Sequence, residues 1–305
     1  MFTLRQLRIF SAVAEERSFS RAAKRLYLTQ PAVSIQVRQL EERVGMPLLD
    51  RSGRDIRLTE AGAELLVHCR AIERQLDEAQ RMLDDLRGLR RGRIHLTMAA
   101  TANYFAPQMI VPFHRRYPEA RITIEVANRA GLIAALEENR SDMVIMGRPP
   151  EGLAVEQTIF CDNPLVAIAA PDHPLAGQGE EIPLERLLEE PFIMREADSG
   201  TRIAIQRFLD RHGLQPEVVM EMNRTEAVKQ TVMAGLGVGI VSLHTLDMEL
   251  RLRRLAVLPV AGFPIMRHWY LVHREGKRLA AMARAFKEFV LSEGAALLSL
   301  PRMEG

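Results

Sequence analysis

The chain has 305 residues, of which 47% are hydrophobic and 26% are charged, a composition typical of globular proteins with two or three domains. It has no run of 18 apolar residues and no signal-peptide pattern, which predicts a cytoplasmic protein without membrane contact. The two cysteines, Cys69 and Cys161, lack the spacing of metal ligands, so neither a zinc site nor a disulfide framework is expected.

Charge is unevenly distributed along the chain. Residues 1–58 carry 11 Lys and Arg against 6 Asp and Glu, a net charge of +5, whereas the rest carries 30 basic and 33 acidic residues, a net charge of −3. A small basic segment on a mildly acidic body is typical of a nucleic-acid-binding module joined to another domain.

The first segment is predicted to be helical. Apolar residues at helical spacing indicate an amphipathic helix over 4–16 and a helical hairpin over 19–45. In the second helix of the hairpin, Thr29 is suited to be the N-cap and Pro31 falls in the first turn, where proline is tolerated. Gln and Ser side chains near that turn, among basic neighbours, suit the major groove of DNA. An ordinary surface hairpin is the alternative.

A short β-hairpin is expected next, around residues 52–53. Its three arginines, Arg51, Arg54 and Arg57, make it a candidate wing that lies along phosphate or in the minor groove. A solvated loop is the alternative, and it is the favoured interpretation for Arg57.

A long helix over 59–88 carries a narrow apolar stripe with alternating spacings of four and three residues, as in a coiled coil. At ~1.5 Å per residue the helix spans about 45 Å, too long to pack wholly on the preceding head. A second copy of the chain is the simplest partner, and Cys69 is interpreted as a small residue of the stripe and not as a reactive thiol. The expected dimerisation residues are Leu65, Ile72, Leu76, Leu83 and Leu86. Residues 89–92 are expected to be a hinge linker.

From residue 93 onward, strand-like apolar runs alternate with helical segments. Strands without polar alternation, separated by helices, are typical of parallel sheets covered on both faces. The pattern predicts two α/β lobes with a cleft between them, lobe 1 over 93–161 and 267–305 and lobe 2 over 162–266. The expected strands are 94–100, 122–127, 143–147, 165–170, 192–194, 218–222, 238–242 and 269–273, and the expected helices lie near 103–117, 130–140, 201–213, 224–235 and 278–292.

Hydroxyl, amide and cationic side chains follow three of these strands. Ligands of α/β sheets bind at the carboxyl ends of strands, often against helix N-termini. The pattern therefore predicts a cleft for a small carboxylated or phosphorylated anion. Simple helix caps and surface ion pairs are the alternative. The candidate effector-binding residues are Thr101, Ala102, Asn103, Arg148, Pro149, Arg195, Ser199, Gly200, Thr201 and Arg202.

Taken together, these features resemble the LysR-type bacterial transcription regulators over essentially the whole chain. The resemblance is carried by LRQL from Leu4, SFSRAA from Ser18, LTQPAVS from Leu28, QLE from Gln39 and LTEAG from Leu58. It implies an α/β multidomain protein: a winged helix-turn-helix over 1–58, a linker helix over 59–88 and a two-lobed effector domain similar to periplasmic binding proteins. It also implies homodimers and homotetramers that bind double-stranded promoter DNA near RNA polymerase.

Within the family, the effector domain is most similar to the activators of Calvin-cycle operons, the CbbR type. The residues that carry this likeness are Thr101 with YFAP from Tyr104, MGRPP from Met146, DSGTR from Asp198 and VSLHTL from Val241. The likeness implies a phosphorylated metabolite of carbon fixation, or NADPH, as a reversible effector, with no resident cofactor. A regulator of other carbon or sulfur genes with a carboxylate or oxyanion effector is the alternative.

The resemblance also assigns residues. Gln30, Pro31 and Ser34 match the family's groove-reading positions, Arg54 matches its wing arginine, and Thr101 and Thr201 match the positions that hold the acidic group of the effector. The full set of expected DNA contacts is Ser20, Arg21, Gln30, Pro31, Ser34, Gln36, Arg38, Arg51 and Arg54.

Two further classes of protein are disfavoured. Lobe 2 lacks the cysteine pair that the peroxide-sensing branch of the family uses, so redox sensing is not expected. No paired acid and base, activated nucleophile or metal site is visible, so an enzyme or a solute-binding protein with a DNA-binding head is the weaker alternative.

Overall fold

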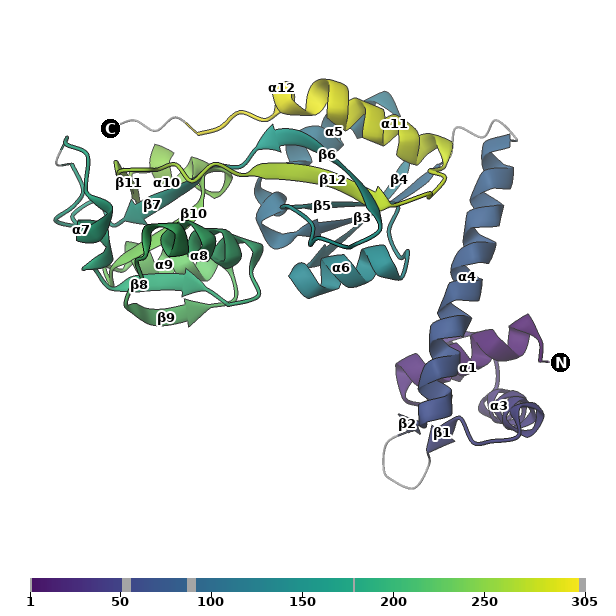
Figure 1. Ribbon diagram of the computed structural model, residues 1–305. Coiled ribbons are helices and arrows are strands. Elements are labelled where there is room, and N and C mark those ends of the chain that lie inside the picture. Colours follow the sequence, from purple (N-terminus) through teal and green to yellow (C-terminus); the bar gives the residue numbers. More distant parts are fainter. Residues whose placement is uncertain (1, 51–55, 87–91, 178, 302–305) are drawn as a thin grey trace. The chain divides into compact units, whose positions relative to one another are not determined.

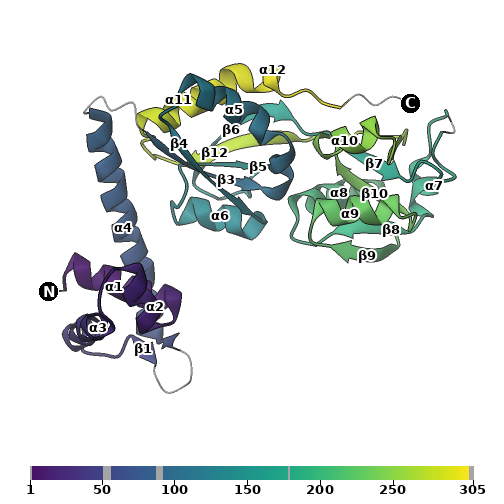
Figure 2. The ribbon, with the colours of Figure 1, turned by 180° about the vertical axis from the view of Figure 1, so that it is seen from behind.

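The computed structural model describes residues 2–50, 56–86, 92–177 and 179–301, and the chain forms two compact units, Met1–Leu86 and Arg87–Gly305 (Figures 1 and 2). Among the described helices, none combines the length and the apolar character that a membrane span requires.

The first unit is a small helical domain with a β-hairpin. Its elements are α1 (Leu4–Glu16), α2 (Phe19–Arg25), α3 (Gln30–Val44), β1 (Leu49–Asp50), β2 (Arg57–Leu58) and α4 (Glu60–Leu86). The side chains of Ser18 and Thr29 cap α2 and α3, and the strands β1 and β2 pair antiparallel. The predicted helical hairpin and β-hairpin are therefore both confirmed for the residues described.

The core of this unit also receives part of α4. Cys69 is fully buried in it, and Leu65 and Ile72 pack against it. The beginning of the apolar stripe therefore covers the chain's own head, whose core would otherwise be open to water. Farther along the stripe, Leu76 and Leu83 remain 46% and 52% exposed. Only the exposed part of the stripe is therefore available for the predicted dimer contact, and the contact stays a prediction. The side chain of Leu86 lies outside the described residues.

Lobe 1 of the second unit contains a five-stranded mixed sheet in the order β4-β3-β5-β12-β6. In Figure 1, α5 and α11 cover one face and α6 covers the other. The elements of this lobe are β3 (Arg93–Ala99), η1 (Ala100–Tyr104), α5 (Ala106–Arg116), β4 (Arg121–Ala127), α6 (Arg129–Glu137), β5 (Met143–Met146), β6 (Val155–Asp162), β12 (His268–Arg274), α11 (Ala281–Phe289), η3 (Val290–Gly294) and α12 (Ala295–Leu297).

Lobe 2 repeats this arrangement with a sheet in the order β11-β7-β10-β8-β9, which packs against α8 on one face and α9 on the other. Its elements are β7 (Leu165–Ala169), α7 (Leu184–Leu188), β8 (Phe192–Arg195), α8 (Gly200–His212), β9 (Val218–Met222), α9 (Thr225–Met233), β10 (Val238–Ser242), η2 (Leu243–Thr245), α10 (Asp247–Arg251) and β11 (Ala256–Leu258).

The expected parallel pairing is confirmed for three strands of each sheet, but both sheets are mixed. Strands β4, β3 and β5 are parallel, as are β10, β8 and β9, but β12 runs antiparallel to β5 and β6, and β7 runs antiparallel to β10 and β11. The antiparallel strands β7 and β12 are the first strands after the chain crosses from one lobe to the other. Their direction follows from that crossing and not from a local βαβ connection.

The chain crosses between the lobes twice, after β6 and again before β12. The two crossing segments are hydrogen-bonded to each other: the Asn163 N–H donates to the Arg267 carbonyl oxygen at 2.7 Å. Leu165 and Ile265 exchange two further backbone hydrogen bonds of 3.0 and 2.9 Å. The hinge of the second unit is therefore a paired, two-stranded connection.

Candidate functional site

A pocket of about 340 Å³ is lined by residues of both lobes. Four arginines and one glutamate stand among its walls, so the pocket is strongly cationic. Its polar lining comprises Thr101, Asn128, Arg129, Asn163, Arg195, Glu196, Ser199, Thr201, Asn223, Arg224 and Arg267.

The N-terminus of α8 forms one wall of the pocket. Strand β8 ends at Arg195, and Ser199 caps the helix, its Oγ accepting a hydrogen bond of 3.2 Å from the Thr201 N–H. The first amides of a helix have no intrahelical acceptor and carry the positive end of the helix dipole, which favours an anion. The position of a Cβ on Gly200 would lie 3.7 Å from Nη2 of Arg267 and 3.9 Å from Nη1 of Arg129. Both guanidinium groups therefore converge on this helix terminus.

Arg267 is the most unusual of the cations. Its guanidinium lies against the backbone of Gly147, where a Cβ would collide with Nη2, so a side chain at position 147 would displace the guanidinium from its place in the pocket. Burial first, and then the neighbouring charges of Arg129 and Arg207, lower the pKa of Arg267 to about 10. Within the described part of the chain, no carboxylate forms an ion pair with it.

Two neighbours of Arg267 add a second cation and an unpaired donor. Burial and the charge of Arg207 also lower the pKa of Arg129, whose Nη1 donates to the Arg148 carbonyl oxygen at 3.2 Å. Trp269 lines the pocket, and its buried Nε1 has no hydrogen-bond partner among the described residues. Buried donors and repelling cations of this kind are costly unless an acceptor is present, so the site favours an anion with several oxygen atoms.

Arg195 also lines the pocket, but its charge is already compensated. Its guanidinium makes a bidentate pair with Glu196 at 2.7 and 2.8 Å, and Nη1 donates to Thr225 Oγ1 at 2.8 Å. The residue therefore fixes the beginning of α9 beside the pocket.

The structure brings together only some of the predicted effector residues. Thr101, Arg195, Ser199, Gly200 and Thr201 line the pocket. The other five do not: Ala102 is buried in the core of lobe 1, Asn103 is exposed, Arg148 is exposed and ion-paired with Glu151 at 3.6 Å, Pro149 is buried away from the pocket, and Arg202 lies on α8 outside the lining. For Ala102 and Asn103 the reason is local, because the tight turn of η1 buries Ala102 in the core and exposes Asn103.

The sequence prediction missed seven of the polar residues that line the pocket, namely Asn128, Arg129, Asn163, Glu196, Asn223, Arg224 and Arg267. Asn128 and Arg129 follow the carboxyl end of β4 and begin α6, and Asn128 caps that helix. The rule that ligands bind at the carboxyl ends of strands, which located Thr101, would have located both residues as well. Arg267 carries no such local signal, because it lies in the second crossing between the lobes.

The polar side of α3 is open in the first unit. Gln30 and Pro31 are exposed and Ser34 is half-buried, whereas Val33 and Val37 are fully buried on the opposite side. Two further predicted contacts lie on the accessible side and pair locally: Arg38 with Glu42 at 3.0 Å and Gln36 with Gln39 at 3.2 Å. Ser20 is exposed at the beginning of α2, and Arg51 and Arg54 lie outside the described residues.

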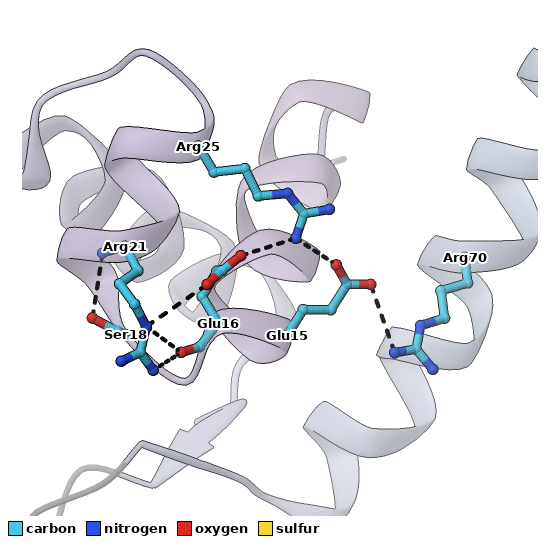
Figure 3. A network of polar contacts seen from close by, with 6 residues as sticks. All are labelled: Glu15, Glu16, Ser18, Arg21, Arg25 and Arg70. Carbon is cyan, nitrogen blue, oxygen red and sulfur yellow. Dashed lines mark hydrogen bonds and ion pairs between the residues drawn. The ribbon is translucent and has the colours of Figure 1, made fainter.

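The network in Figure 3 gives Arg21 a role within the domain. Its Nε donates to the Glu16 carbonyl oxygen at 3.2 Å, which ties α2 to the C-terminal end of α1. In the same network, Glu15 accepts a hydrogen bond of 2.8 Å from Arg25 and forms an ion pair of 3.6 Å with Arg70 of α4. These arginines hold three helices together, and DNA contact by Arg21 stays a prediction.

Metal and thiol chemistry find little support in the described residues. They contain no group of three or more His, Cys, Asp or Glu side chains that could hold a metal ion. Burial raises the pKa of Cys69, and burial together with the charge of Asp162 raises the pKa of Cys161 to about 12. Both thiols are therefore protonated near neutral pH.

Comparison with known proteins gives consistent matches over the whole chain. Two family models match, "LysR substrate binding domain" over residues 87–295 and "Bacterial regulatory helix-turn-helix protein, lysR family" over residues 4–63. The RuBisCO operon transcriptional regulator of Allochromatium vinosum is 51% identical over 96% of this chain and 97% of its own length. The regulator CbbR of Rhodospirillum rubrum is 43% identical over 94% of this chain and 95% of its own length.

A solved structure matches the second unit. The regulatory domain of CcmR from Synechocystis PCC6803, determined in complex with 2-PG, is 36% identical, with a TM-score of 0.64. The match covers 69% of this chain and 99% of the CcmR chain.

Proposed function

The chain belongs to the LysR family of bacterial transcription regulators, and from this premise we propose that it controls carbon-fixation genes in response to a small phosphorylated anion. Like other members of the family, it binds promoter DNA, forms oligomers and binds a small-molecule effector. The similarity to RuBisCO operon regulators supports the choice of target genes.

The position of Arg267 carries the proposal for the effector. Its guanidinium lies beside that of Arg129 and the N-terminus of α8, with no compensating carboxylate among the described residues. A phosphoryl group offers several oxygens and about two negative charges, which suit guanidinium groups and helix amides together. 2-Phosphoglycolate is the first candidate, since CcmR was determined with 2-PG. NADPH is the larger competitor.

On the DNA side, we propose that α3 enters the major groove and reads bases with Gln30 and Ser34. The exposed part of the stripe on α4 would join two copies, so that two heads meet successive faces of the promoter. Activation would follow contact with RNA polymerase in the cytoplasm, and the effector would bind reversibly, with no resident cofactor.

Calorimetric titration of the full chain with 2-phosphoglycolate, glycolate, inorganic phosphate and NADPH tests the effector. We expect 2-phosphoglycolate to bind more tightly than either of its two fragments, because the pocket has both arginines and hydroxyl groups for its two acidic ends. If glycolate bound as tightly, or if none of the compounds bound, the assignment of a phosphorylated effector would be wrong.

Footprinting on the promoter of a carbon-fixation operon from the same genome tests the output. The effector should change the footprint of the wild type, and Ser34→Arg should abolish the footprint while the heat of effector binding stays unchanged. A Ser34→Arg variant that protected the promoter like the wild type would overturn the assignment of the reading surface. Promoter affinity should also fall steeply with salt, because phosphate contacts release counterions.

A further inference from the structure

A second polar cluster connects the two lobes close to the pocket, through residues that do not line it. We call it the clasp and define it as Tyr104, Glu226, Lys229 and Glu249. Tyr104 belongs to η1 of lobe 1, and the other three residues belong to α9 and α10 of lobe 2. The Tyr104 hydroxyl donates to Glu226 Oε2 at 2.9 Å, and Lys229 Nζ lies 4.7 Å from the centre of the Tyr104 ring. The clasp is therefore a direct side-chain connection between the lobes.

Lys229 holds the lobe 2 side of the clasp in place. Its side chain is only 1% exposed, and Nζ donates to Glu249 Oε1 at 2.5 Å and to the Thr245 carbonyl oxygen at 2.9 Å. Nζ also lies 2.9 Å from Glu226 Oε2, the same oxygen atom that accepts the Tyr104 hydroxyl. An ammonium group has three donors, and here all three have acceptors. The position of Glu226, the acceptor of the Tyr104 hydroxyl, is therefore fixed by contacts within lobe 2.

Both sides of the clasp continue into the effector pocket. Thr101 lines the pocket and lies one turn before Tyr104 in η1. On the other side, Asn223 and Arg224 line the pocket, and Arg224 is the residue that precedes α9. A change in the spacing of the lobes at the pocket must therefore change the distance between Tyr104 and Glu226.

The surroundings of the clasp leave room for such a change. A cavity of about 290 Å³ lies beside it, lined by clasp residues together with His244, Asp247 and Arg251. Asp247 and Arg251 form their own ion pair at 3.0 Å and do not compete for Lys229. The Tyr104 hydroxyl can thus leave Glu226 without a clash and without leaving Lys229 unpaired.

We propose that the Tyr104–Glu226 hydrogen bond is a conformational latch that stabilises one spacing of the two lobes against all others, so that its loss changes the affinity for the effector. This rests on the proposed effector response. A ligand can shift a conformational equilibrium only by its differential affinity for the two states, so the latch sets the concentration at which the regulator responds.

Tyr104→Phe tests the latch, because it removes only the hydroxyl and keeps the ring over Lys229. Tyr117→Phe is the matched control, since Tyr117 packs against Phe113 within lobe 1, with ring centres 4.8 Å apart. A hydrogen bond to a charged group is worth enough to shift binding by about 10-fold. We expect the affinity of Tyr104→Phe for 2-phosphoglycolate to differ from that of the wild type by roughly 3- to 10-fold, and its footprint to change at a correspondingly shifted concentration. Tyr117→Phe should stay within about twofold of the wild type. Binding by Tyr104→Phe within about twofold of the wild type would overturn the latch.

A second measurement judges the latch without any effector. Spin labels at Arg115→Cys in lobe 1 and Glu185→Cys in lobe 2 report the distance between the lobes, and both positions are exposed. In the effector-free protein, Tyr104→Phe should shift or broaden the distance distribution and Tyr117→Phe should not. An unchanged distribution would overturn the latch even if the effector assignment held. If the wild type bound none of the ligands, the proposed function would fail while this distance measurement still decided the latch.

Discussion

Two cations of the second unit, Lys229 in the clasp and Arg267 in the pocket, leave bulk water on folding but meet different partners. Burial alone lowers the pKa of Lys229, yet its hydrogen bonds to Glu249 and Glu226 raise that pKa above the ordinary value. For Arg267, burial and two neighbouring arginines act in the same direction, and the pKa falls to about 10. The fold compensates the first charge and leaves the second uncompensated within the described residues. An uncompensated, partly buried charge is the mark of a ligand site, whereas a compensated one is part of the framework.

The thermal stability of the protein without effector provides the first test of this contrast between Lys229 and Arg267. Lys229→Met leaves two carboxylates beside a buried position, which typically costs about 3 kcal/mol and lowers Tm by roughly 6–12 °C for a domain of this size. Arg267→Gln removes a repelling charge and should leave Tm unchanged or raise it. Thermal unfolding followed by circular dichroism measures both variants, and equal losses would show that the two cations do not differ in this way.

Effector affinity should respond in the opposite sense. Arg267→Gln removes a charge-assisted contact and should weaken binding of 2-phosphoglycolate by about 10- to 100-fold in a calorimetric titration. Arg148→Gln is the control, since it removes the same charge from an exposed residue outside the pocket and should stay within about twofold. Similar losses in both variants would indicate a general field effect and not a specific contact.

Acid unfolding tests the clasp through Glu226. A hydrogen bond from Gln230, with others from Lys229 and Tyr104, lowers its pKa from 4.5 to about 2. The unfolded chain then binds the proton more readily, so the stabilisation is complete above about pH 4.5 and is lost as the pH falls from 4.5 toward 2. Urea unfolding at several pH values should show a difference between wild type and Glu226→Gln that is constant near neutrality and shrinks below pH 4.5. A difference independent of pH in this range would contradict the pairing.

Thiol reactivity extends the comparison to a group that is neutral when protonated. Burial raises the pKa of both cysteines, that of Cys161 to about 12, for the same reason that it lowers the pKa of Arg267. At pH 8 an aromatic disulfide reagent should react with the native thiols on the order of 100-fold more slowly than with the chain in guanidinium chloride. Rapid reaction of either thiol in the native protein would show that its surroundings open readily.

The elements of the head could be predicted because their signals are local. Ser18 and Thr29 cap the helices that they precede in the sequence, and the apolar spacing fixes which sides face the core. The antiparallel strands could not be predicted in the same way, because strand direction depends on how the chain returns from the other lobe. Strand β6 was missed for a different reason: only Phe160 of its eight residues is buried, and polar residues interrupt its apolar ones, so the sequence presents no long apolar run.

The residues of the pocket also divide into those with a local sequence signal and those without one. Thr101, Ser199 and Thr201 could be found because each follows a strand and begins a helix. Asn128 and Arg129 obey the same rule and were within reach of the sequence. Arg267 was not, because it reaches the pocket only through the second crossing, which sequence periodicity does not encode.

The paired crossings have a mechanical consequence. Two connections that are hydrogen-bonded side by side resist sliding and twisting of one lobe against the other and leave bending about one axis as the soft motion. Arg267 belongs to one of these connections, and its carbonyl oxygen accepts the hydrogen bond that ties it to the other. A ligand bound by the Arg267 side chain therefore acts directly on the hinge between the lobes. Whatever the chemistry of the ligand, we expect its binding to change one quantity, the bending angle between the two lobes.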